Sequence, residues 1–343
     1  MRRSLTCNPT VSTQNDITCN PIVSTQIDTS VSDQIQSIIR TSQPTQQYKP
    51  PKLPNLGNTC YLNSTLQILI LSDYYFNIQP LLSSYNSDND NSLQNIKSLL
   101  FCTSTPLSDS EILNACKGIK NDLAEFDSNI FDNFRQQDAH EAFLKICYFL
   151  DTKTKLELFT PSQQDDQSYT SVIKQLFFGI LTTNEICSNC GHNETKTLVP
   201  FLNIFVEPSF DFNKNLTAEW NRKNDQKLCN FCHNNSKHLQ TTNILTKPNI
   251  LVILFQRFKQ QRSGRISKLN TEINLVDDLK IPGFSGTLIG CIYHLGSTPN
   301  SGHYISSIKI NNSWFSCNDN IIKPTTAPLN SESVYLAFYK ALD

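Results

Sequence analysis

Cys60 has the sequence setting of a reactive thiol. It lies in the segment LPNLGNTCYLNS, in which a loop of Gly and Asn residues runs directly into a predicted helix. The N-terminus of a helix offers free N–H groups and a partial positive charge, which lower the pKa of a thiol and stabilise an oxyanion. The side-chain amide of Asn55, just upstream, adds a further donor. Cys60 is therefore a candidate nucleophile, with a buried structural cysteine as the alternative.

His303 supplies the base that such a thiol needs. It opens a predicted strand after a polar loop, and the segment WFSCNDN follows a predicted hairpin turn at Asn311-Asn312. An antiparallel return of the chain would bring Asn318 or Asp319 beside His303. A Cys–His–Asn/Asp arrangement gives a thiolate–imidazolium pair with an orienting third group. A histidine with a purely structural role on its strand is the alternative.

Two C-x-x-C pairs indicate a metal site. The pairs are Cys187 with Cys190 and Cys229 with Cys232. Four thiolates complete the tetrahedral shell of one Zn²⁺. The gap between the pairs exceeds that of a minimal zinc ribbon, so a long β-excursion pinned at its base is expected. The alternatives are metal-free thiols and a redox pair, but a redox pair would need a βαβ context that the sequence lacks.

The composition excludes several classes of protein. The 343 residues include 29 Lys and Arg against 30 Asp and Glu, a net charge of −1 that argues against a nucleic-acid or membrane-surface protein. The chain has no apolar run long enough to span a membrane, and no apolar segment follows the basic start, so no secretory signal is expected. The 12 cysteines are then expected to be reduced, in the cytoplasm or nucleus.

Residues 1–48 are predicted to form a disordered polar tail. They are rich in Ser, Thr, Gln and Asn, and a 12-residue tandem repeat places TCNPTVSTQ and TCNPIVSTQ one after the other. Two copies cannot build a solenoid, and so little apolar surface does not offset the entropy of ordering. The folded, catalytic domain is predicted over residues 49–343.

Helical patterns come first in the folded region and strand patterns second. Apolar residues recur at helical spacing in 58–71 and 138–150, and Asp138 and Glu141 have capping-box spacing at the start of the second helix. Runs typical of strands lie at 198–206, 250–255, 287–293, 304–310 and 334–339. This order predicts an α+β fold in which a helical lobe packs against a largely antiparallel sheet.

Together these segments resemble the ubiquitin-specific protease family. The segment around Cys60 resembles the cysteine box of the family, and YHLG, GHY and the later Trp and Asn-Asp resemble its histidine box. QQDAHE, PNILVILFQRF and the ending YLAFY match further family segments in the same order. The resemblance spans roughly residues 52–342.

The resemblance implies a papain-like cysteine protease fold of thumb, palm and zinc-pinned β fingers around one cleft. The helices around Cys60 would be the thumb and the strands around His303 the palm. The excursion over about 185–240 would be the fingers, which grip the body of ubiquitin.

The resemblance also assigns roles to single residues. Cys60 matches the nucleophile, His303 the general base, Asn318 the third member of the triad and Asn55 the oxyanion donor. Asp is frequent in the family where this chain has Asn318. The neighbouring Asp319 is therefore expected to carry part of the electrostatic role.

The implied activity is that of a thiol-dependent deubiquitinase. It would cleave the isopeptide or peptide bond after the C-terminal glycine of ubiquitin through a thioester intermediate. Asp138 and Glu141 match acidic positions that receive the basic tail of ubiquitin, and one Zn²⁺ is structural rather than catalytic. The expected partners are ubiquitin and ubiquitinated proteins, without nucleic acid or membrane, and the expected state is a monomer.

Three alternative functions account for less of the sequence. A papain-like peptidase has its histidine roughly 130–150 residues after the cysteine, whereas His303 follows Cys60 at a much greater distance. A catalytically silent ubiquitin-binding module is disfavoured because Cys60, His303 and Asn318 are all intact. A zinc-ribbon nucleic-acid protein is disfavoured by the net charge of −1.

Overall fold

The computed structural model describes most of the predicted folded region. The described residues are 48–78, 82, 93–131, 135–157, 169–261, 264, 266–298, 301–328 and 330–342. The predicted tail lies outside them up to residue 47. Tyr48, which the sequence analysis assigned to the tail, is part of the folded region, since its side chain is buried and its ring stacks on Tyr74 with 5.5 Å between ring centroids.

Helices dominate the described chain up to residue 178. They are α2 (Cys60–Phe76), α4 (Gln94–Leu100), the 3-10 helix η2 (Phe101–Thr103), α5 (Asp109–Phe126), α6 (Ser128–Phe131), α7 (Ala139–Lys153) and α8 (Val172–Phe177). The short strands β1 (Leu156–Glu157) and β2 (Tyr169–Thr170) pair between α7 and α8. The two helices that the apolar spacing predicts are α2 and α7. These helices form the helical lobe.

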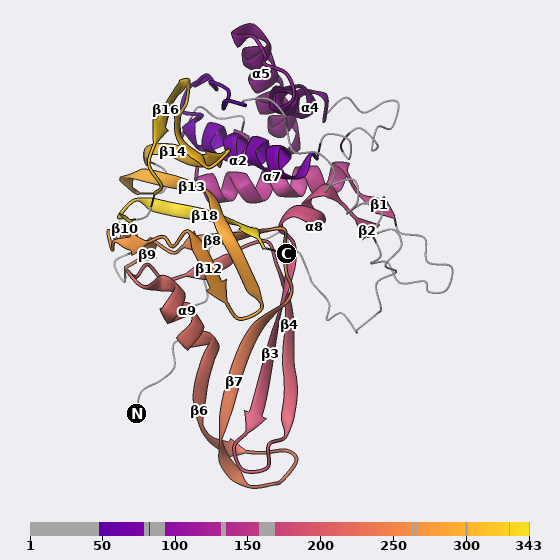
Figure 1. Cartoon of the computed structure of the whole chain (residues 1–343), viewed down its shortest axis with the longest axis vertical. Coiled ribbons are helices and arrows are strands. Elements are labelled where there is room, and N and C mark those ends of the chain that lie inside the picture. The colour runs from indigo at the N-terminus through magenta and orange to yellow at the C-terminus, as the bar shows by residue number, and fades with distance from the viewer. Residues whose placement is uncertain are drawn as a thin grey trace.

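The central helix of this lobe is α2. Every residue of α2 except Tyr75 is buried, because the helix lies between α7 on one side and β14 (Ser301–Ile310) on the other (Figure 1). A helix that is apolar on several sides is buried in a core. The residues after the predicted end, up to Phe76, remain in α2 and all but Tyr75 are buried. The helix stops at Asn77, whose left-handed backbone (φ 48°) turns its N–H onto the carbonyl of Asp73.

A large sheet of eight strands follows. Its order is β16-β15-β14-β13-β18-β8-β5, with β12 paired to the start of β13. The strands other than β14 are β5 (Ile204–Val206), β8 (Ile250–Phe255), β12 (Asp278–Ile281), β13 (Phe284–Thr298), β15 (Ser313–Asn318), β16 (Ile321–Thr325) and β18 (Val334–Ala341). All neighbours are antiparallel except β5 and β8. The prediction of a largely antiparallel sheet packed on helices is confirmed.

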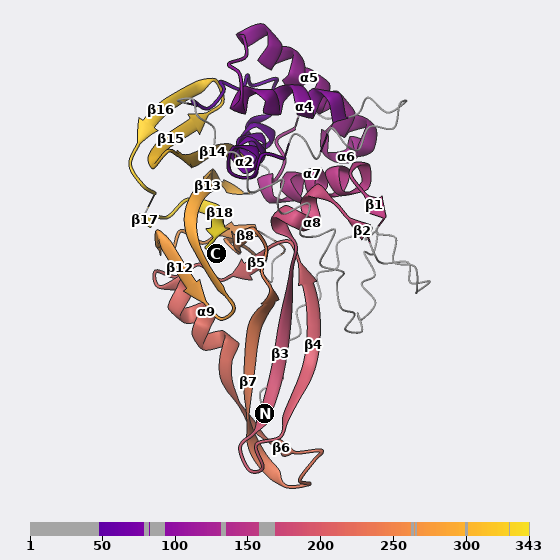
Figure 2. The ribbon, with the colours of Figure 1, turned by 45° about the vertical axis from the view of Figure 1, so that its right-hand side comes forward.

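A small sheet of four strands extends away from the helical lobe (Figure 2). Its order is β4-β3-β7-β6, from β3 (Gly179–Cys187), β4 (Asn193–Phe201), β6 (Asn221–Leu228) and β7 (Asn235–Thr246). The predicted single strand 198–206 is wrong: β4 ends at Phe201, the chain bends, and β5 joins the large sheet. The helix α9 (Phe212–Trp220), which the sequence analysis did not predict, leads into β6.

Four short strands complete the described secondary structure. The strands β9 (Phe258–Gln260) and β10 (Ile266–Lys268) form a hairpin. The strands β11 (Ile273–Asn274) and β17 (Asn330–Ser331) form a second antiparallel pair.

The large sheet is covered on both faces. Alternate residues of β8 belong to two separate cores, one shared with the helical lobe and one shared with α9 and β12. The two sets are Ile250, Val252 and Leu254, and Leu251, Ile253 and Phe255. A strand buried on both faces has a continuous apolar sequence, which is why the apolar run at 250–255 predicts both ends of β8 correctly.

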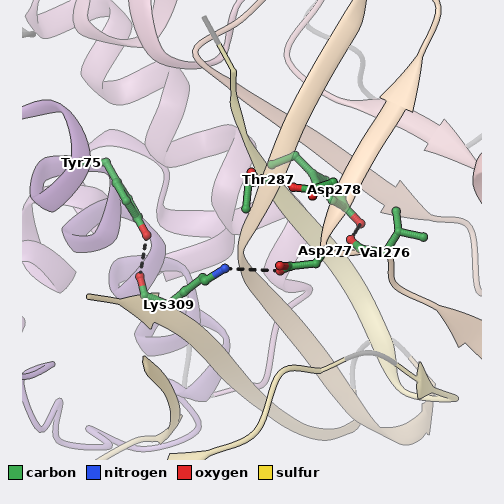
Figure 3. Close-up of polar contacts among 7 residues, drawn as sticks. Tyr75, Val276, Asp277, Asp278, Thr287 and Lys309 are labelled. Carbon is green, nitrogen blue, oxygen red and sulfur yellow. Dashed lines mark hydrogen bonds and ion pairs between the residues drawn. The ribbon is translucent and has the colours of Figure 1, made fainter. Parts of the chain in front are cut away.

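Polar contacts attach α2 to the large sheet (Figure 3). The hydroxyl of Tyr75 donates to the carbonyl of Lys309 on β14 at 2.9 Å, and the ammonium group of Lys309 lies 3.4 Å from the carboxylate of Asp277. The hydroxyl of Tyr74 donates to Asn311 in the turn after β14 at 2.5 Å. The C-terminal half of α2 is thereby held on β14, the strand whose other end carries His303.

Candidate active site

The loop that precedes α2 is folded around the side chain of Asn55. Its Oδ1 accepts the N–H groups of Gly57 at 3.0 Å and Thr59 at 3.2 Å. Gly57 and Asn58 both have positive φ, 97° and 53°, which glycine and asparagine adopt most readily. This loop places Cys60 as the first residue of α2, with its side chain buried.

The expectation that the pKa of Cys60 is lowered is wrong for this structure. Burial raises the pKa of the thiol above its ordinary value, and the carboxylate of Asp319 raises it further. Backbone hydrogen bonds from Tyr304, Tyr61 and Cys60 itself lower the pKa, but burial is the largest effect. In this state the helix terminus does not compensate for the loss of solvent around the sulfur.

His303 and Asn318 form a hydrogen-bonded pair. The strands β14 and β15 are joined through a turn in which Asn311 and Asn312 both have positive φ, 48° and 62°, as a tight hairpin requires. The return strand places Asn318 Oδ1 2.7 Å from His303 Nε2, so the expected antiparallel return is confirmed for Asn318. An amide oxygen only accepts, so Nε2 carries the proton and Nδ1 is left as the base.

Asp319 points to different partners from those of its neighbour Asn318. Its backbone has a positive φ of 50°, and its carboxylate accepts from Asn55 Nδ2 at 2.9 Å and from Asn63 Nδ2 at 2.7 Å. Asn63 is buried one helical turn after Cys60 and also donates to the carbonyl of Pro54 at 3.1 Å. The sequence analysis did not single out Asn63, although its spacing of three residues from Cys60 is a usable signal.

These contacts bring the candidate residues into one site. Asp319 accepts hydrogen bonds from Asn55, before Cys60, and from Asn63, after it, and it directly follows Asn318, the partner of His303. The hydrogen bonds of the described residues include none between Cys60 and His303. Catalytic hydrogen bonds are often long before substrate binds.

Asp138 is the N-cap of α7. Its Oδ1 accepts the N–H groups of His140 at 2.8 Å and Glu141 at 3.1 Å, and its Oδ2 accepts the hydroxyls of Tyr335 at 2.8 Å and Tyr304 at 3.4 Å. The predicted helix start is confirmed, and the carboxylate has four donors. The side chain of Glu141 is exposed, and partial desolvation together with the charge of Asp138 raises the pKa of its carboxyl group.

The four predicted metal ligands form a cluster at the far end of the small sheet, and the expectation that they pin the excursion at its base is wrong, because β3 ends at Cys187 and β6 ends just before Cys229 at the end remote from the helical lobe (Figure 2). The sulfur atoms of Cys187, Cys190, Cys229 and Cys232 all lie within 4.8 Å of one another. Two of the separations, Cys187 to Cys232 and Cys190 to Cys229, are 4.0 and 3.8 Å. Sulfur atoms around a tetrahedral Zn²⁺ with Zn–S bonds of about 2.3 Å lie about 3.8 Å apart. The four-cysteine cluster can therefore hold a structural metal ion.

The backbone around the cluster repeats itself. The N–H groups of Gly191 and His233 each bond back to the carbonyl of the first cysteine of their pair at 2.9 Å, and both residues have positive φ. The ring of His192 stacks on the ring of Phe231, with centroids 4.6 Å apart and planes 3° from parallel. The two turns are thus held face to face, which keeps the four sulfur atoms together.

A buried cysteine at a helix start, beside a histidine–asparagine pair, is the arrangement of a cysteine hydrolase. The family model described as ubiquitin carboxyl-terminal hydrolase matches residues 51–339. The chain therefore belongs to the ubiquitin carboxyl-terminal hydrolase family.

Curated relatives agree with this assignment. The chain is 29% identical over 323 residues to ubiquitin carboxyl-terminal hydrolase 25 of Arabidopsis thaliana, a match that covers 87% of this chain and 48% of the relative. It is 25% identical over 339 residues to ubiquitin carboxyl-terminal hydrolase 8 of Saccharomyces cerevisiae, a match that covers 84% of this chain and 69% of the relative. The chain thus spans about half the length of the plant relative.

Solved structures share the fold. The SAGA Ubp8/Sgf11/Sus1/Sgf73 DUB module bound to ubiquitin aldehyde matches with a TM-score of 0.70 at 22% identity, over 92% of this chain and 74% of that chain. A related SAGA DUB module bound to monoubiquitin matches with a TM-score of 0.72 at 22% identity, over the same shares. The helical lobe, large sheet and small sheet are the thumb, palm and fingers of this fold. No helix among the described residues is long and apolar enough to cross a membrane.

Proposed function

We propose that this chain is a thiol-dependent deubiquitinase whose nucleophile is Cys60. Family membership supports the class of reaction. The observation that carries the proposal is the meeting of the α2 start with the His303–Asn318 pair, in which Asp319, next to Asn318, accepts hydrogen bonds from Asn55 and Asn63 on either side of Cys60. The proposed catalytic domain is residues 48–343, since Tyr48 packs into the folded region, and the proposed substrates are ubiquitin joined to proteins or to itself.

The first half of the reaction forms a thioester. His303 Nδ1 takes the proton of Cys60 as the sulfur attacks the carbonyl carbon of the C-terminal glycine of ubiquitin. The tetrahedral intermediate then breaks its C–N bond, and the lysine amine leaves with the proton that His303 returns to it.

Asn55 is the proposed side-chain donor for the oxyanion. Its Nδ2 carries two hydrogens, and one of them is given to Asp319. The second hydrogen and the backbone N–H of Cys60 are the donors for the developing negative charge. Asp319, which Asn63 holds from the other side, keeps the amide of Asn55 oriented and polarised. This is the electrostatic role proposed for Asp319.

The second half of the reaction releases ubiquitin. His303 Nδ1 removes a proton from a water molecule, whose oxygen attacks the thioester carbonyl. The C–S bond then breaks, ubiquitin leaves with a free carboxylate, and Cys60 regains its proton from His303. Asn318 accepts the Nε2 proton throughout and keeps the ring in the tautomer that both steps require.

Glu141 is the better candidate for a direct contact to the basic tail of ubiquitin. Its carboxyl group is exposed, whereas that of Asp138 already accepts four hydrogen bonds. Asp138 would then support the substrate channel through Tyr304 and Tyr335. The four-cysteine cluster would hold one Zn²⁺, which supplies no chemistry to the reaction and stabilises the small sheet that grips ubiquitin.

Labelling with a ubiquitin that carries a C-terminal electrophile tests the proposal. The wild-type chain should gain one ubiquitin, Cys60→Ala should gain none, and Cys116→Ala, which removes a buried cysteine of α5, should label as the wild type does. In hydrolysis of ubiquitin–amidomethylcoumarin, the wild type and Cys116→Ala should be equally active and Cys60→Ala should be inactive. Labelling that persists in Cys60→Ala would exclude Cys60 as the nucleophile.

A further inference from the structure

Gln136 connects the loop before α7 to the strand of His303. Its Oε1 accepts the N–H of Gly302 at 2.9 Å, and Gly302 directly precedes His303. The bond crosses between the helical lobe and the large sheet and joins segments far apart in the sequence. The reaction described above gives Gln136 no role.

Gly302 lies at a crowded irregularity of the large sheet. Pairing between β13 and β14 shifts register between Leu295 and Thr298, opposite Gly302. Gly302 has a φ of 150°, and a Cβ on it would lie 2.4 Å from the carbonyl oxygen of Leu295 and 2.9 Å from His294 Nε2. Gln136 accepts the Gly302 N–H at this irregularity, where β13 is out of register.

The segment that holds Gly302 also holds the other parts of the site. Two residues after Gln136, Asp138 accepts the hydroxyl of Tyr304, on the other side of His303, at 3.4 Å. The carbonyl of the next residue, Ala139, accepts the hydroxyl of Thr65 on α2 at 3.4 Å. Residues 136–139 therefore contact both the strand of the base and the helix of the nucleophile.

The second polar atom of Gln136 argues against a purely structural role. Its Nε2 is buried and has no hydrogen-bond partner among the residues that the structure describes. A buried donor without a partner is destabilising, whereas Gly302 is exposed, so its N–H can bond to water when Gln136 Oε1 is removed. Stability alone therefore does not favour glutamine at this position.

We propose that Gln136 is a positioning residue that sets the separation of His303 and Cys60 by holding the Gly302 amide. The inference rests on the proposed function, in which His303 must reach the Cys60 thiol. Gln136 acts through the backbone of β14. Its loss should consequently slow the proton transfers without weakening substrate binding, whereas the folded state should be unaffected.

Three variants test the inference in the full chain. Gln136→Met removes both polar atoms at nearly constant shape, and Gln136→Glu keeps an oxygen to accept the Gly302 N–H. Gln175→Met makes the same change in a half-buried glutamine of α8. With ubiquitin–amidomethylcoumarin, Gln136→Met should lower kcat about tenfold with KM within about twofold of wild type and an unchanged or raised melting temperature. Gln136→Glu should recover most of kcat, and Gln175→Met should keep the wild-type kcat.

A spectroscopic measurement separates positioning from other effects. In protein with isotope-labelled histidine, the ring signals of His303 should shift in Gln136→Met and remain in place in Gln175→Met. An unchanged kcat in Gln136→Met, a raised KM with kcat intact, or a fall in melting temperature that parallels kcat would each overturn the inference. Failure of the proposed function would instead appear in the wild type, as absence of hydrolysis and of Cys60 labelling.

Discussion

Replacing Asp138 by alanine should destabilise the protein more than it alters the chemistry. The carboxylate caps α7 through two backbone N–H groups, and losing such a cap costs about 0.5–2 kcal/mol. It also accepts the hydroxyl of Tyr335, whose side chain is only 6% exposed, and a buried donor left without a partner costs about 1–3 kcal/mol. The bond to Tyr304 is long, at 3.4 Å, and adds little. Asp138→Ala should therefore lower the free energy of unfolding by about 2–4 kcal/mol.

Asp138→Asn is the matched control. Asparagine caps a helix about as well as aspartate, and its amide group can donate to the two tyrosine hydroxyls, but the hydroxyl hydrogens then lose the carboxylate that accepts them. The charge at the helix N-terminus, about 0.3–1 kcal/mol, is lost as well. At ~2–3 °C per kcal/mol for a domain of this size, Asp138→Ala should melt about 5–10 °C below wild type, and Asp138→Asn, which keeps the cap, should melt between the two.

Thermal unfolding followed by circular dichroism, with kcat and KM measured well below the melting transition, is the appropriate assay. The expected order of melting temperatures is wild type, Asp138→Asn, Asp138→Ala. Equal melting temperatures for the alanine variant and wild type would refute the reasoning, because the four hydrogen bonds to this carboxylate would then contribute nothing to the folded state.

Three further predictions concern other parts of the site. Glu141→Gln should lower kcat/KM for ubiquitin substrates about tenfold or more while the melting temperature stays near wild type, since an exposed carboxylate contacts substrate rather than the core. A changed melting temperature with intact kcat/KM would show that Glu141 stabilises the fold and does not contact substrate. Cys187→Ser should abolish the binding of one Zn²⁺ per chain, as metal analysis measures, and should raise KM more than it lowers kcat, because structural zinc stabilises its surroundings locally. Alkylation of Cys60 by iodoacetamide should accelerate with pH around a midpoint above the ordinary thiol value of about 8.5, because burial raises its pKa and the thiol form persists to higher pH; a midpoint below that value would indicate an ion pair already formed with His303.

The sequence alone determined features that depend on local spacing. The two asparagines after β14 specify a tight hairpin, so the spacing along the chain is enough to bring Asn318 or Asp319 beside His303, and the folded chain selects Asn318. Two C-x-x-C pairs likewise predicted the four-cysteine cluster, and the continuous apolar run at 250–255 predicted the strand β8. Periodicity and turn chemistry depend on residues that are neighbours in the sequence, so the sequence alone is enough to predict them.

Tertiary packing alone decided the contacts between distant segments. Asn63 and Gln136 carry no pattern that reveals their partners, Asp319 and Gly302, because those partners, in the turn after β15 and on β14, meet the helical lobe only after folding. The direction of the Cys60 pKa shift was also beyond the sequence. The helix terminus is a local feature that favours the thiolate, but the burial that outweighs it arises from the packing of α2 against β14. Desolvation depends on everything that surrounds an atom, and only the folded chain specifies those surroundings.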